Sequence, residues 1–297
     1  MRKSEVGNRK YEVGRLAALA IIGLMLATAF SGCLGGEKEA GVSQEQSEET
    51  VEEELEGVNE TINETKENII FADNFDDNKM DPLWKTADCD NDDPTTFEEK
   101  EGMMQIFAGG KDMNERYGEG VDEYAAVYHS KIDGDFNVTV KVLSLELDGV
   151  GAVPENDYFY PGIWAHAGIM IRNDISAAGS STGYVFMCAQ KTFWAFYADT
   201  DDNGYVEDSN GFNSEDKTVF PCWLKIAKKE KTFTGFYSVD GTNWKQLGNF
   251  TINSANPSQD VGLFGCAVKG LVPLPVGYPN QVYNGCLSKF DDFVISR

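Results

Sequence analysis

The stretch FTGFYSVDGTNWKQL, residues 233–247, decides the fold class. Two runs rich in Phe, Tyr, Thr and Trp flank an Asp-Gly pair, which suits the two central residues of a type I′ hairpin turn. With that turn at the centre, Tyr237 falls opposite Trp244, and Phe233, Tyr237 and Trp244 share one face. We interpret the stretch as a scaffold hairpin with cross-strand aromatic pairs, although a sugar-binding platform has the same pattern.

Short alternating runs continue on both sides of this hairpin, separated by clusters of Gly, Asn and Asp. Examples are AAVYHS at 125–130, FNVTVKVLSLEL at 136–147 and FWAFYA at 193–198. Period-two alternation is frequent, and no long stretch carries a helical period of about 3.6 residues. The sequence therefore predicts one all-β domain over residues 70–297, a sandwich of two antiparallel sheets.

Residues 1–32 have the pattern of a lipoprotein signal peptide. Basic residues precede the uncharged run LAALAIIGLMLATAF at 16–30, which is shorter than the roughly 20 residues of a membrane-spanning helix. The following SGC resembles the lipoprotein signal common in archaea, although Phe30 stands where bacterial signals have Leu. We expect Cys33 to become the lipid-carrying N-terminus, on the outer face of the cytoplasmic membrane. A plain signal peptide followed by a Cys is the alternative.

Residues 33–69 form an acidic segment with twelve Glu against Lys38 and Lys66. Such a segment buries too little apolar surface to fold, so we expect a disordered tether behind the lipid. The formal net charge of the chain is −24, which excludes nucleic acid as a partner because phosphates need a basic surface. We expect contact with the membrane through the lipid anchor only.

Several motifs resemble a concanavalin A-like jelly-roll family that forms the C-terminal domain of some β-xylosidases. These are FADNFDDNKMDPLW at 71–84, AGIMIRND at 167–174, GYVFMC at 183–188, WLKIAKKEKTFTGFYSVDGTNWKQLG at 223–248 and FDDFVIS at 290–296. The resemblance implies a concanavalin A-like jelly-roll β-sandwich in which the first and last strands pair. It implies a fold more firmly than an activity, because this fold hosts lectins, hydrolases and spacers.

Cysteine spacing favours two disulfides. Cys188 and Cys222 are symmetric about residue 205, and Cys266 and Cys286 are symmetric about residue 276. If each pair faces across one hairpin, each can close a disulfide, which an extracytoplasmic location permits. Cys89 is then left over.

The sharpest local motif is ADTDDNGYVEDSN, residues 198–210. Alternating carboxylate and amide oxygens followed by Gly match the start of a calcium-binding loop, in which side chains converge on one hard cation. The candidate Ca2+ ligands are Asp199, Asp201, Asn203, Glu207 and the carbonyl of Tyr205. Asn210 stands where a bidentate Glu normally closes such a loop, so an acidic hairpin loop without metal remains the alternative.

A second acidic group is expected where the terminal strands meet. Structural calcium lies between the terminal strands in many related jelly rolls, so the resemblance makes Asp76 and Asp291 secondary metal candidates. Ordinary turn aspartates are the alternative interpretation.

The segment VPENDYFYPGIWAHAG at 153–168 combines flat aromatic rings with carboxylates, as a sugar-binding site requires. The run KTFWAFYADT at 191–200 leads from aromatic residues into the acidic loop. The candidate ligand-binding residues are Asp157, Tyr158, Tyr160, Trp164, Trp194 and Tyr197. The alternative is that these rings fill the core.

Evidence for catalysis is thin. LELDGVG at 145–151 resembles half of the E-x-D-x-x-E strand of laminarinase-like hydrolases, but Gly151 replaces the second Glu. We therefore expect a non-catalytic cell-surface lipoprotein that binds an extracellular polysaccharide or glycoprotein with calcium. A structural or adhesion domain of the envelope with protein partners is the first alternative, and a glycoside hydrolase is the second.

Overall fold

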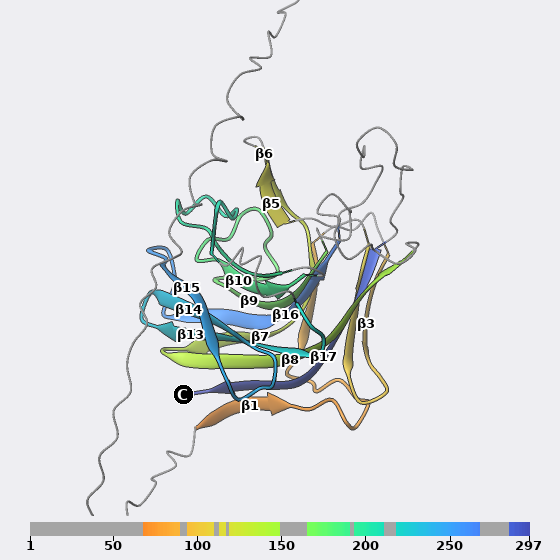
Figure 1. Ribbon diagram of the computed structural model, residues 1–297. Coiled ribbons are helices and arrows are strands. Elements are labelled where there is room, and N and C mark those ends of the chain that lie inside the picture. Colours follow the sequence, from red (N-terminus) through yellow and green to blue (C-terminus); the bar gives the residue numbers. More distant parts are fainter. Residues whose placement is uncertain are drawn as a thin grey trace, which may run out of the picture. The chain divides into compact units, whose positions relative to one another are not determined.

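The computed structural model describes residues 68–89, 94–109, 113–116, 119–148, 165–190, 193–210, 218–267 and 285–297. They form two antiparallel sheets and a separate two-stranded hairpin, and contain no helix (Figure 1). No helix that could cross a membrane therefore occurs in these ranges. The expected all-β jelly-roll sandwich is confirmed. The predicted signal peptide and almost all of the predicted acidic tether lie outside the described residues.

Sheet A has eight strands, and the last strand of the chain runs through its middle. The order is β15 (Lys245–Thr251), β14 (Thr232–Ser238), β13 (Cys222–Lys229), β8 (Phe136–Asp148), β17 (Gly285–Ser296), β4 (Met104–Ala108) and β3 (Thr95–Glu99). The first strand, β1 (Ile69–Asp73), pairs with β17, where Asp73 lies opposite Phe293. The expected pairing of first and last strands is confirmed (Figure 1).

Sheet B has seven strands and packs against sheet A. The order is β12 (Asp208–Asn210), β11 (Trp194–Ala198), β10 (Val185–Ala189), β9 (His166–Arg172), β16 (Ser258–Cys266), β7 (Ala125–Asp133) and β2 (Lys85–Asp88). The separate hairpin consists of β5 (Met113–Arg116) and β6 (Glu119–Asp122).

Sheet B is buried on both faces. Along β10, Val185 and Met187 point into the core between the sheets, whereas Phe186 and Cys188 point into a second apolar cluster on the other side. Strands buried on both faces read as continuous apolar runs, as VFMCA and HAGIMIR do here. We call the face of sheet B turned away from sheet A the covered face. The opposite outer surface, on sheet A, is called the open face.

The hairpin that predicts the fold class exists, but its register differs from the prediction. Tyr237 pairs with Lys245 and not with Trp244, and the turn is a loop of residues 239–244. Gly241 has φ +77°, whereas Asp240 is not among the residues with positive φ, so the turn is not type I′.

The Asp240 carboxylate explains this longer loop. It accepts hydrogen bonds from Ser238 Oγ at 2.9 Å, from the Thr242 amide at 2.9 Å and from the Asn243 amide at 2.7 Å. These bonds, with that from the Asn243 side chain first, hold the pKa of Asp240 below its usual value. An aspartate that organises its own loop in this way displaces the two-residue turn.

The predicted disulfides are wrong, because none of the five described cysteines forms a disulfide. In each predicted pair, one thiol belongs to the core between the sheets and the other to the cluster on the covered face. Cys222 and Cys286 lie in the first, and Cys188 and Cys266 in the second. Symmetry along the sequence therefore paired a core-facing thiol of sheet A with a thiol on the far side of sheet B.

We expect thiol chemistry to reflect this burial. In a Cys33→Ser chain, a thiol reagent should modify only the half-buried Cys89 quickly, and four more thiols should react after unfolding. Burial raises the pKa of Cys222 and Cys286 to about 12, which further slows their reaction. A Cys89→Ser chain should show almost no native reactivity. Failure of unfolding to release further thiols without reductant would contradict the structure.

Candidate functional site

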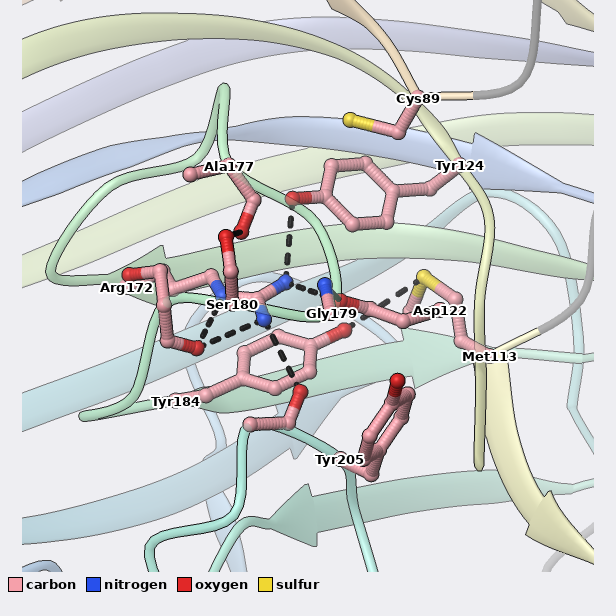
Figure 2. Close-up of polar contacts among 12 residues, drawn as sticks. Cys89, Met113, Asp122, Tyr124, Arg172, Ala177, Gly179, Ser180, Tyr184 and Tyr205 are labelled. Atoms are coloured by element: carbon pink, nitrogen blue, oxygen red, sulfur yellow. Dashed lines mark hydrogen bonds and ion pairs between the residues drawn. The ribbon is translucent and has the colours of Figure 1, made fainter. Parts of the chain in front are cut away.

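The covered face of sheet B is organised around one buried guanidinium. Arg172, the last residue of β9, is fully buried, and its Nη1 donates to Asp122 Oδ2 at 2.6 Å and to Tyr124 Oη at 3.1 Å. The Tyr184 ring packs against the guanidinium, with 4.2 Å between the ring centroid and the Arg172 Cζ. Figure 2 shows the guanidinium between the two tyrosine rings with Asp122 beside it.

The same guanidinium binds the backbone of two loops. Its Nε and Nη2 donate to Ser181 O at 3.0 and 2.7 Å, and Nη2 also donates to Gly204 O at 2.9 Å. Asp122, at the end of β6, accepts in addition from the Gly179 amide. Arg172 therefore joins the hairpin β5–β6, the loop of residues 173–184 and the acidic loop after β11.

Each charge of the Arg172–Asp122 ion pair opposes the effect of burial on the pKa of the other group. Burial alone raises the pKa of Asp122, and the Arg172 charge opposes that rise. For Arg172, burial opposes ionisation, but Tyr124 and Asp122 more than compensate, so the guanidinium stays charged. The bonds to carbonyl oxygens occupy its remaining donors, as a buried charge requires.

The acidic loop follows β11 and brings three carboxylates together. One oxygen from each of Asp199, Asp201 and Glu207 lies within 4.8 Å of the other two. Asp199 is fully buried, and its two oxygens accept from the amides of Asn203 at 3.0 Å and Gly204 at 2.9 Å. Carboxylates at this spacing are the donors that a hard divalent cation prefers.

Negative charge accumulates in this loop. Burial, followed by repulsion from Asp202 and Asp201, raises the pKa of Asp199 to about 6. Burial, followed by the charges of Asp201 and Asp199, raises the pKa of Glu207 to about 7. No ion pair among the described residues involves the three grouped carboxylates, so a cation would relieve their mutual repulsion.

The remaining predicted metal ligands are placed differently. The Asn203 side-chain oxygen accepts from the Tyr205 amide at 2.7 Å, so it belongs to the turn itself. Ligation by the Tyr205 carbonyl stays a prediction. Asp291 accepts from Lys141 Nζ at 3.0 Å, whereas Asp76 accepts from Asn74 Nδ2 at 2.6 Å. Within the described ranges, neither Asp76 nor Asp291 joins a group of three possible ligands.

The two aromatic candidates on β11 lie on opposite faces of sheet B. Trp194 is only 2 % exposed and stacks on Tyr237 between the sheets, with 4.3 Å between centroids, so its assignment to a ligand site is wrong. Tyr197 is partly exposed on the covered face and stacks on Phe186 at 4.6 Å. The His166 ring lies 5.9 Å from the Tyr197 ring. Asp157, Tyr158, Tyr160 and Trp164 lie outside the described residues.

Alternation along β11 places Tyr197 beside the acidic loop. Residues two apart in an extended chain point the same way, so Tyr197 and Asp199 share the covered face. One face of sheet B thus carries a partly exposed aromatic ring next to a group of three carboxylates. The Arg172 network was not predicted, although an arginine at the end of the apolar run AGIMIR is the signal for it.

Comparison with known proteins gives likeness in fold only. No protein-family model matches the chain, and no curated protein matches it in sequence. A functionally unknown protein from Saccharomyces cerevisiae is 13% identical with a TM-score of 0.48, over 72% of this chain and 96% of that one. LamAcat from Zobellia galactanivorans is 12% identical with a TM-score of 0.47, over 77% of this chain and 98% of that one. The GH43 protein BlXynB from Bacillus licheniformis is 15% identical with a TM-score of 0.47, over 76% of this chain and 39% of that one.

Replacing Asp122 should be severely destabilising. Asp122→Ala leaves the Arg172 charge buried without its partner, which costs about 3–5 kcal/mol of unfolding free energy in comparable cases. Glu146→Gln is the matched control, because it breaks the exposed ion pair to Lys289 and should cost less than about 1 kcal/mol. Urea unfolding of both variants measures the difference. Equal losses would show that the Arg172 network does not stabilise the covered face.

Without divalent cations, the protein should lose stability as the pH rises. The folded-state pKa values of about 6 for Asp199 and about 7 for Glu207 exceed the ordinary values of 3.8 and 4.5. The folded chain therefore binds more protons than the unfolded chain in this range, and the free energy of unfolding falls as pH rises through about 5–7. Urea unfolding in a chelator measures this slope. Glu207→Gln should flatten it, and an unchanged slope would contradict the assignment.

Proposed function

We propose that the chain is a cell-surface lipoprotein whose β-sandwich binds an extracellular polysaccharide or glycoprotein without catalysis. Cys33 carries the lipid on the outer face of the cytoplasmic membrane, and residues 33–69 form the acidic tether. The sandwich of residues 70–297 presents its ligand site on the covered face of sheet B. Calcium bound in the acidic loop orders that site.

The observation that carries the proposal is the position of Tyr197 beside the group of Asp199, Asp201 and Glu207. A partly exposed ring offers a flat apolar surface for a sugar ring, and a bound cation offers a ligand for hydroxyl oxygens. Arg172 supports this arrangement, because its bond to Gly204 O holds the acidic loop against sheet B.

Non-catalytic binding fits these carboxylates better than hydrolysis. A retaining glycosidase needs two carboxyl groups about 5–5.5 Å apart and free to reach the sugar. Both oxygens of Asp199 accept backbone amides, which ties this carboxylate into its own loop. Glu146, the candidate suggested by the laminarinase-like motif, is on sheet A and binds Lys289 Nζ at 2.7 Å.

Calcium should raise the thermal stability of the mature chain, and glycan binding should require it. Calcium at about one hundred times its Kd adds about 2.7 kcal/mol to the free energy of unfolding, and each kcal/mol raises Tm by about 2–4 °C for a domain of this size.

A panel of polysaccharides and glycoproteins should yield a ligand whose binding is lost in chelator. Asp201→Asn should weaken calcium binding at least about tenfold, and Tyr197→Ala should weaken glycan binding while the calcium shift in Tm persists.

Glu98→Gln is the matched control, because it removes an exposed carboxylate on the other sheet and should change neither quantity. A Tm that ignores calcium, with no ligand on the panel, would overturn the proposal. The chain would then be assigned to envelope architecture with protein partners. Release of sugars from any panel member would instead show a hydrolase.

A further inference from the structure

Three neighbouring strands of sheet A lack acidic residues. In a chain with 49 acidic and 25 basic residues, the strands β13, β14 and β15 contain no Asp or Glu at all. Of their four lysines, Lys225 and Lys229 alternate with the core residues Leu224 and Ile226 and point to the open face. The other two do not: Lys228 is buried and donates to Gly134 O at 3.0 Å, and Lys245 pairs with the core residue Tyr237. Exposed lysines in a protein of net negative charge attract anionic ligands to their part of the surface.

Aromatic side chains lie among these lysines. Leu224 and Ile226 point into the core between the sheets, so Trp223 and Lys225, which alternate with them, point to the open face. A Cβ on Gly235 would lie 2.8 Å from the Phe196 ring of sheet B, which places the next residue, Phe236, on the open face. Both Trp223 and Phe236 are partly exposed.

The lysines and rings are direct neighbours across the strands. Lys225 pairs with Phe236 on β14, and its Nζ lies 4.8 Å from that ring centroid and 4.3 Å from the Trp244 centroid. Trp223 pairs with Lys141 on β8, whose Nζ lies 5.6 Å from the Trp223 ring. We call Lys141, Trp223, Lys225, Phe236 and Trp244 the Trp-Lys cluster.

Hydroxyl and amide side chains surround the cluster. Lys225 pairs with Thr139 on β8, and Phe236 pairs with Gln246 on β15. Thr234 and Asn249 pair in the adjacent row of the same face. Flat rings, ammonium groups and neutral hydrogen-bonding groups on one surface match a polymer of sugar rings that carries negative charge.

We propose that the Trp-Lys cluster binds an anionic polysaccharide, one with carboxylate groups on its sugar rings. The rings of Trp223, Phe236 and Trp244 take the apolar faces of the sugars, and Lys225 pairs with the carboxylates. Lys141 borders the site but is already paired with Asp291 at 3.0 Å. This inference rests on the proposed location outside the membrane but not on the calcium-ordered site of sheet B. The acidic loop repels such a ligand, which directs it to sheet A.

The test measures binding of the mature chain to polygalacturonate and to its fully methyl-esterified, neutral form. We expect binding to the charged polymer only, weakening as salt rises. Trp244→Ala should weaken binding about tenfold, as truncation of a central aromatic anchor does, whereas Trp244→Phe should retain most of it. Lys225→Gln should weaken binding about two- to fivefold and reduce the salt dependence.

Lys289→Gln is the matched control, because Lys289 is a sheet A lysine that pairs with Glu146 and lies outside the cluster. It should leave binding unchanged. Chelator and Tyr197→Ala should also have no effect, which separates this inference from the proposed function. If both of those abolish binding, the ligand occupies sheet B and the inference about sheet A fails while the proposed function stands.

Three further outcomes would overturn the inference. The first is equal binding of the neutral polymer, and the second is unchanged binding by Trp244→Ala and Lys225→Gln. The third is binding that emerges only after deletion of residues 34–67. In that case the acidic tether of the chain itself would be the occupant of the Trp-Lys cluster.

Discussion

The buried ion pair between Arg172 and Asp122 is the constraint on which the covered face depends. A guanidinium with no exposed surface needs a countercharge and acceptors for its remaining N–H groups. The protein supplies them from three separate segments, which end up fixed against one another. The acidic loop is one of these segments, so the position of its carboxylates follows from the solvation of a single arginine.

The two outer surfaces of the sandwich differ in burial and in the charged groups that they carry. Loops lie over sheet B, bury its outer side chains and bring acidic groups to its edge. The open face of sheet A keeps Lys225 and the rings of Trp223 and Phe236 partly exposed, with no acidic residue in β13, β14 or β15. In a molecule with a large negative net charge, the proposed cation site and the proposed anion site therefore lie on different sheets.

Much of this could be predicted from the sequence, where the signal is local. Alternation gives the strands, and the spacing of Asp199, Asp201 and Glu207 gives the carboxylate group. Face assignments were less predictable. Trp194 and Tyr197 belong to one aromatic run, yet their positions differ by an odd number, so one enters the core and the other the covered face. The cysteine pairs were mispredicted for the same reason, because symmetry along the sequence does not determine the side of the sheet to which each thiol points.

The hairpin register was unpredictable for another reason, since the hydrogen bonds of Asp240 outweigh the ordinary preference of Asp-Gly for a short turn.

The place where the chain enters the sandwich has a mechanical consequence. The Asn68 carbonyl accepts from the Arg297 amide at 3.0 Å, and β1 joins sheet A through β17. Phe71 of that strand packs edge-on against Trp84 with 5.0 Å between centroids. A pull on the tether proposed for residues 33–69 would load the five residues of β1 first, and the packing of the Phe71 ring would resist their extraction.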